Sequence, residues 1–179
     1  MPEIWVSLAL KTGIDELKLT TRDIKDYSEL MKIRINVLNK EKIKAKELFS
    51  IASNIKPFDG ACEFLESIRK KYQVIILSDT FFNLSNPIFK KLNWPTVFCH
   101  KLLINEEGMI SGMKKCLEDH KRVIVKSMNS LGFNTIAVGD SYNDLNMLKE
   151  SNTGILFRST DKIIANNSNY FSCKEYSSL

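Results

Sequence analysis

The hydrophobic pattern of the chain changes near residue 57. Before that point apolar residues recur at helical spacing, most clearly in the run Leu30, Met31, Ile33, Ile35 and Leu38. Asp26 stands where it can cap the helix that contains this run. No segment before residue 57 has the alternation of a strand, and Pro57 and Gly60 mark a boundary. The pattern therefore predicts a helical segment over residues 1–56.

From residue 57 onward short apolar runs alternate with helical stretches. We predict helices at 61–72, 86–92, 119–131, 143–150 and 161–166, strands at 73–77, 96–99, 135–138 and 154–157, and a small hairpin over 100–111. Strands that alternate with helices form βαβ units and a parallel sheet. The fold class predicted for residues 57–179 is therefore α/β, with a polar, loose tail from Tyr170.

Two of the predicted strands end abruptly at small polar and acidic residues. One run ends at Ser78 and Asp79, and the other is followed by Asp140, Asn143 and Asp144. Ligands of open α/β sheets bind outside the carboxyl ends of the strands, so these side chains are expected to share one crevice. A hydroxyl beside several carboxylates is typical of a site for a hard cation and a phosphate.

Each candidate residue also has a purely structural interpretation. Asp140 and Ser78 suit turns and caps, and Asp144 suits the dipole of the helix that follows it. Lys121 opens the helix that precedes the Asp140 strand, where it could reach a phosphate or simply be a solvated surface lysine. Arg34 and Glu3 are, taken singly, charges on the wet face of a helix. Only the combination of polar strand ends favours a site.

Composition narrows the class of protein. The 179 residues carry a net charge of +5, mainly from lysines in scattered doublets, and a positive charge suits an anionic substrate. The sequence contains no signature of a nucleic-acid-binding motif. No apolar stretch is long enough to span a bilayer. The four cysteines form no CxxC pair, which predicts free thiols in a cytoplasmic protein, and His100 and His120 are interpreted as structural.

The segments Leu77–Thr80 and Gly139–Asp144, together with Lys121, resemble three motifs of the haloacid dehalogenase superfamily. Within it the chain is similar to the phosphoserine phosphatase branch, and there to the bifunctional phosphoserine phosphatases / phosphoserine:homoserine phosphotransferases. Further matching segments are 2–5, 20–24, 99–102 and 154–157. The resemblance implies a Rossmann-like core over 57–179 with an inserted helical cap within 1–56.

The resemblance also implies a reaction and a role for each residue. An aspartate attacks the phosphorus of phosphoserine, in serine biosynthesis, and water or the acceptor homoserine then takes the phosphoryl group. The implied roles are Asp140 as a Mg²⁺ ligand, Ser78 and Lys121 on the phosphoryl group, Asp79 and Asn143 in the substrate pocket, Glu3 at the substrate amino group and Arg34 at its carboxylate. The resemblance implies no role in binding nucleic acid or membranes.

The sequence departs from the family at its start. The family carries an Asp-x-(Asp/Glu)-Gly motif on a central strand just before the segment matched by Pro2–Trp5, and here Met1 directly precedes Pro2. We therefore expect the chain as given to lack the nucleophile and to fold poorly, because two strand edges would be unpaired. The alternative function is an inactive remnant or pseudoenzyme that binds phosphorylated metabolites. Nucleic-acid binding through the lysine excess is a third and weaker alternative.

Overall fold

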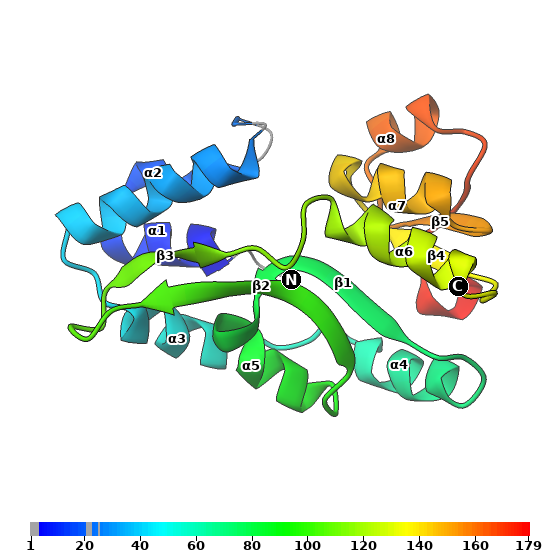
Figure 1. Ribbon diagram of the computed structural model, residues 1–179, viewed down its shortest axis with the longest axis horizontal. Coiled ribbons are helices and arrows are strands. Elements are labelled where there is room, and N and C mark those ends of the chain that lie inside the picture. The colour runs from blue at the N-terminus through cyan, green and yellow to red at the C-terminus, as the bar shows by residue number, and fades with distance from the viewer. Residues whose placement is uncertain (1–3, 21–22, 25) are drawn as a thin grey trace. The chain divides into compact units, whose positions relative to one another are not determined.

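A computed structural model of the protein describes residues 4–20, 23–24 and 26–179 (Figure 1). The chain divides into two compact units, Met1–Cys116 and Leu117–Leu179, which we call the N-terminal and C-terminal units. Each has its own three-stranded sheet, and we describe them separately. The division at residues 56 and 57 into a cap and a core stays a prediction.

The first part of the N-terminal unit is helical, as predicted. Its elements are α1 Ile4–Thr12, the 3₁₀ helix η1 Asp15–Lys18, α2 Tyr27–Lys40 and α3 Ala45–Ser53. Asp26 is the N-cap of α2, and its side chain accepts hydrogen bonds from the backbone N–H of Ser28 and Glu29 at 2.7 and 3.3 Å. The inward faces of these helices bury leucines and a methionine at Leu8, Leu17, Met31, Leu38 and Leu48.

The second part of the N-terminal unit carries its sheet. The elements are α4 Ala61–Arg69, β1 Ile75–Phe81, α5 Phe82–Lys91, β2 Thr96–Ile104 and β3 Ile110–Lys114. The strand order is β1-β2-β3, with β1 parallel and β3 antiparallel to β2. Phe81 and Leu84 at the β1–α5 junction join the same buried cluster as the leucines of α1 and α3. One core therefore holds the helices and the sheet of this unit together.

The C-terminal unit is a small parallel α/β layer. It contains α6 His120–Ser130, β4 Ile136–Gly139, η2 Tyr142–Asp144, α7 Leu145–Glu150, β5 Thr153–Phe157, α8 Asp161–Asn166, β6 Phe171–Cys173 and η3 Tyr176–Ser178. The strand order is β4-β5-β6, and α7 packs against β4 and β5. At Gly154 a Cβ would lie only 2.8 Å from the ring of Tyr170 and 3.0 Å from the Leu148 carbonyl oxygen, so β5 needs glycine there.

The predictions for β1 and for the tail need correction. The strand predicted at 73–77 runs instead over Ile75–Phe81, so Ser78 and Asp79 lie within β1 and not after it. The tail from residue 170, predicted to be loose, contributes β6, which pairs with β5 through the register Ile155–Phe171. Both strands extend because a neighbouring strand supplies backbone hydrogen bonds that local sequence does not reveal.

β1 and β4 are edge strands among the residues that the structure describes. β1 pairs with β2 alone and β4 with β5 alone. Ile136 and Val138, on one face of β4, are 53% and 38% exposed, which is unusual for the β-branched residues of a parallel sheet. These are the two strands that lead into the polar segments of the candidate site.

Candidate active site

The predicted site residues fall into two groups, one in each unit, and each group is described by itself. Ser78, Asp79 and Arg34 belong to the N-terminal unit, and Lys121, Asp140 and Asn143 belong to the C-terminal unit. Glu3 lies outside the described residues.

Ser78 lies where β1 stops following its partner strand. The register between β1 and β2 shifts between Leu77 and Phe81, which frees the intervening backbone from the regular ladder. The Ser78 hydroxyl accepts a hydrogen bond from the Thr80 N–H at 3.3 Å, and the Thr80 hydroxyl in turn bonds to Ser85 at 2.5 Å. Ser78 therefore has the turn-stabilising contact that its structural interpretation predicts, at a place where the strand bulges.

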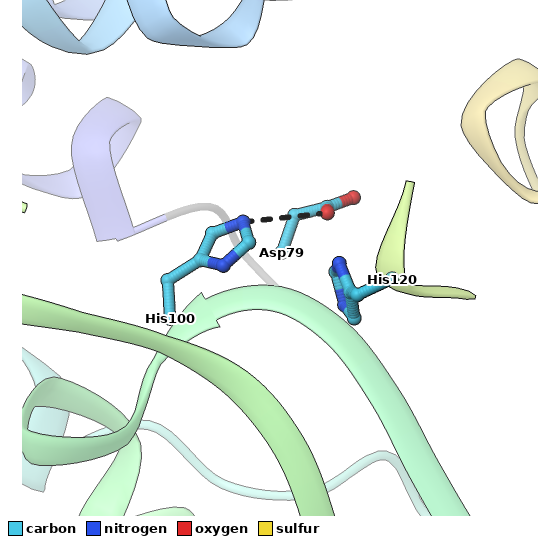
Figure 2. A group of neighbouring side chains, drawn as sticks. All are labelled: Asp79, His100 and His120. Carbon is cyan, nitrogen blue, oxygen red and sulfur yellow. Dashed lines mark ion pairs between the residues drawn. The ribbon is translucent and has the colours of Figure 1, made fainter. Parts of the chain in front are cut away.

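Asp79 is held from two sides by aromatic residues. The Tyr27 hydroxyl donates to the Asp79 backbone carbonyl at 2.8 Å, and burial followed by the Asp79 charge raises the pKa of Tyr27 well above its ordinary value. Tyr27 therefore remains a neutral donor. Figure 2 shows the second contact, in which Nε2 of His100 lies 3.7 Å from Oδ1 of Asp79. The Asp79 side chain is 31% exposed and His100 only 4%.

The tautomer of His100 follows from its other contact. Nδ1 accepts a hydrogen bond from the Cys116 backbone N–H at 3.1 Å, so Nδ1 carries no proton. The imidazole is then neutral, with its proton on Nε2, the nitrogen that faces Asp79. From the sequence His100 was predicted to be structural, without a connection to Asp79. The residues stand far apart in the chain, and only the pairing of β1 with β2 brings them together.

Arg34 is buried, contrary to its interpretation as a charge on a wet helix face. Only 4% of Arg34 is exposed. Its guanidinium donates to the Leu19 carbonyl at 2.6 Å and lies 4.7 Å from the centre of the Trp5 ring. This arrangement holds the last turn of η1 to α2, because Leu19 is the C-cap of η1.

Lys121 and Asp144 form a buried ion pair in the C-terminal unit. Nζ of Lys121 lies 2.9 Å from Oδ1 of Asp144, and the two side chains are 10% and 8% exposed. Oδ2 of Asp144 accepts hydrogen bonds from the backbone N–H of Asp140 and Ser141 at 3.1 and 3.2 Å and from the Ser141 hydroxyl at 3.0 Å. The solvated-lysine interpretation of Lys121 is therefore wrong.

Asp144 is the centre of this group; the sequence predicted that its carboxylate shares the crevice with Asp140 but left its exact role open. Burial disfavours its charged form, but the Lys121 ammonium and the hydrogen bonds from residues 140 and 141 together lower the pKa of Asp144. Gly139 makes the close approach possible, since a Cβ there would lie 2.4 Å from the Asp144 Cβ. The signal in the sequence is the Gly139-Asp140 pair with a second aspartate four residues later.

Asp140 and Asn143 occupy the exposed rim of the same loop. Burial on its protein-facing side and the neighbouring Asp144 carboxylate raise the pKa of Asp140, against the pull of Lys121. The Ser141 hydroxyl bonds to the Asn143 side-chain oxygen at 2.5 Å. A carboxylate that is exposed and repelled by a second carboxylate suits a divalent cation, because the cation would relieve that repulsion. Asp140 therefore fits as a Mg²⁺ ligand, whereas the oxygens of Asp144 are already engaged.

A sequence profile of the haloacid dehalogenase-like hydrolases matches residues 8–152. The chain belongs to this family. It is 44% identical over 164 residues to "Phosphoserine phosphatase ThrH" of Pseudomonas aeruginosa, which covers 92% of this chain and 80% of that protein. It is 43% identical to a phosphoserine phosphatase of Pseudomonas syringae pv. tomato, over 92% of this chain and 69% of that protein.

Solved structures agree with this family at the level of the fold. A crystal structure of phosphoserine phosphatase in apo form matches 97% of this chain and 87% of its own, with a TM-score of 0.77 and 22% identity. A substrate-bound phosphoserine phosphatase complex gives the same TM-score and coverage at 21% identity. The α/β fold of haloacid dehalogenase type, predicted from the sequence, is therefore confirmed. Among the helices that the structure describes, none combines the length and apolar character needed to cross a membrane.

Proposed function

We propose that this protein is a Mg²⁺-dependent phosphoserine phosphatase that acts through an aspartyl-phosphate, with homoserine as a second acceptor beside water. The observation that carries the proposal is the 44% identity to a phosphoserine phosphatase over 92% of the chain. The charge pattern at the end of β4 supports it, because a buried lysine–aspartate pair there stands next to an exposed carboxylate.

In this proposal the C-terminal unit supplies the electrostatic part of the site. Asp140 would hold Mg²⁺, and the cation would neutralise charge on the phosphoryl oxygens. Lys121 is kept charged and oriented by Asp144, so that its ammonium offsets negative charge as the phosphoryl group is transferred. Asn143 lines the substrate pocket from the exposed rim of the same loop.

The N-terminal unit supplies groups for binding phosphoserine. The Ser78 hydroxyl lies at the bulge of β1, where a hydroxyl beside backbone N–H groups would suit phosphate oxygens. Asp79, oriented by Tyr27 and faced by His100, lines the pocket. Arg34 and Glu3 are assigned to the substrate carboxylate and amino group. Because Arg34 already donates to the Leu19 carbonyl, contact with a substrate would use its remaining N–H groups.

The nucleophile requires a further strand in this proposal. A strand bearing Asp-x-(Asp/Glu)-Gly would pair with the edge strand β1 and bring its first aspartate to the carboxyl end of that strand. With that strand joined ahead of Pro2, the protein should release phosphate from phosphoserine.

The test is phosphate release by this extended protein, with and without Mg²⁺. Activity should require Mg²⁺, be removed by EDTA, and fall at least about a hundredfold in Asp140→Asn, because one lost charge contact in a dry site costs about 3 kcal/mol of transition-state stabilisation. Asp161→Asn is the matched control, since that carboxylate belongs to the same unit but its side chain is 97% exposed. Mass detection of phosphohomoserine would measure the transferase reaction.

Two results would redirect the assignment. An extended protein that folds but leaves phosphoserine intact has a different substrate. Binding of phosphoserine without turnover would favour an inactive protein that binds phosphorylated metabolites. Equal activity of wild type and Asp140→Asn would refute the role of Asp140.

A further inference from the structure

Two cysteines of the N-terminal unit lie on neighbouring segments of one antiparallel hairpin. Cys99 belongs to β2, and Cys116 follows the end of β3 by two residues. The ladder between these strands pairs Leu102 with Met113 and Lys101 with Lys114. Continued by two residues in the same register, it places Cys116 opposite Cys99.

The contacts of both residues agree with that placement. The Cys116 backbone N–H donates to Nδ1 of His100, the residue next to Cys99, which holds the segment after β3 against β2. The Cys99 thiol is half-buried against the core and interacts electrostatically with the Cys116 thiol. Residues directly opposite in an antiparallel ladder have Cα atoms about 4.5–5.5 Å apart, within the range of about 4.4–6.8 Å that a disulfide spans.

We propose that Cys99 and Cys116 form a reversible disulfide when the protein meets a peroxide. Cys116 is the last residue of the N-terminal unit. The bond would fasten the start of the connection to α6 onto the first half of β2. The site is independent of the proposed phosphatase activity, because neither cysteine has a role in it.

The chemistry assigns a different role to each sulfur. Burial, and then the neighbouring Cys116 thiol, raise the pKa of Cys99 to about 11, so Cys99 is rarely a thiolate at neutral pH. We therefore assign the first step to the Cys116 sulfur, which attacks one peroxide oxygen; the O–O bond breaks, the thiol proton leaves with the released oxygen as water, and a sulfenic acid forms. The Cys99 sulfur then attacks the Cys116 sulfur and displaces the sulfenic oxygen as water. In total two thiols and one hydrogen peroxide give one disulfide and two waters.

The other two cysteines serve as internal controls. Cys62 lies in α4, where its thiol donates to the Lys91 carbonyl at 3.6 Å, and Cys173 lies in β6 of the C-terminal unit. The register that aligns Cys99 with Cys116 includes neither of them. A folded chain should therefore cross-link one pair of cysteines selectively.

The experiment treats the full chain with hydrogen peroxide, blocks the remaining thiols, and digests it with trypsin under non-reducing conditions. Cleavage at lysine isolates Cys99 in residues 92–101 and Cys116 in residues 116–121, so the linked pair has a defined mass. We expect this linked species, two hydrogen atoms lighter than the sum of its peptides, to dominate and to disappear on reduction. The Cys62→Ser/Cys173→Ser variant should form it equally well, and Cys116→Ser should not.

Unfolding provides a second comparison that depends on no variant. Oxidation in strong urea should scatter the cross-links among all four cysteines, because the register no longer aligns any pair. Selective linkage of residues 92–101 to 116–121 in the native protein alone would support the proposal. Native linkage as scattered as in urea, or sulfinic acid at Cys116 without a linked peptide, would overturn it.

Discussion

Two carboxylates at the end of β4 are expected to affect the stability of the C-terminal unit in opposite directions. Asp144 is buried, pairs with Lys121 and accepts three further hydrogen bonds. Asp140 is exposed on one side and is repelled by Asp144. In Asp144→Asn the amide would present two donors to a site already filled with donors, and the Lys121 charge would lose its partner. In Asp140→Asn the repulsion from Asp144 is lost together with a smaller attraction to Lys121.

The magnitudes follow from burial. Removing one partner of a buried ion pair costs about 3–5 kcal/mol. We expect the lower end for Asp144→Asn, because the Asp140 carboxylate also attracts Lys121 and compensates part of its charge. Asp140→Asn, measured without divalent cations, should leave the free energy of unfolding unchanged or raise it slightly. Adding Lys121→Met to Asp144→Asn should recover part of the loss by removing the unpaired charge.

Acid should reduce the difference between wild type and Asp144→Asn. The pKa of Asp144 is lower in the folded protein than in the unfolded chain, so its stabilisation is complete above the unfolded value, about 4. That stabilisation is lost as the pH falls through the folded pKa. The contribution of Asp140 to stability has the opposite sign. Its pKa is raised in the folded protein, so its charge destabilises the fold at neutral pH, and this cost disappears when acid protonates the carboxylate.

Hydrogen exchange followed by mass spectrometry can measure the change in stability within the C-terminal unit itself. Both tryptophans, Trp5 and Trp94, belong to the N-terminal unit, so their fluorescence reports that unit and serves as the control signal. Protection of the amides of α6 and β4 should fall about a hundredfold in Asp144→Asn, since each 1.4 kcal/mol is tenfold. A fall of less than about fivefold, or an equal fall in Asp140→Asn, would refute the electrostatic reasoning.

Three further predictions concern other contacts. Gly139→Ala should lower the free energy of unfolding by about 1–3 kcal/mol, because the added Cβ would overlap Asp144. In the control Gly112→Ala the added Cβ meets only an ordinary contact at 3.6 Å, so that variant should be nearly neutral. Urea unfolding of both variants tests this. Tyr27→Phe should cost about 1 kcal/mol in tryptophan-detected unfolding through the lost bond to the Asp79 carbonyl, and the exposed Tyr72→Phe should cost nothing measurable. Joining a strand ahead of Pro2 should raise the melting temperature, because it would pair with β1, which has β2 as its one neighbour among the described strands; a cooperative, high-temperature melt of the chain as given would contradict this.

Local sequence predicted those elements whose signals lie within a few neighbouring residues. The Asp26 cap, the helical spacing of α2 and the bounds of α8 come from hydrogen bonds and side-chain periods inside a single element. The position of the polar residues directly after the apolar run of β4 could be predicted for the same reason. The family could be recognised because its motifs are short, contiguous segments of this kind.

The tertiary structure decided the features that depend on residues distant in the chain. β1 extends past Ser78 and the tail forms β6 because a neighbouring strand supplies hydrogen bonds to each. Arg34 and Lys121, which read as solvated charges, are buried because Leu19 and Asp144 offer them oxygen partners. A charge can leave water only where the fold brings it a partner, so its burial cannot be read from its own position in the sequence.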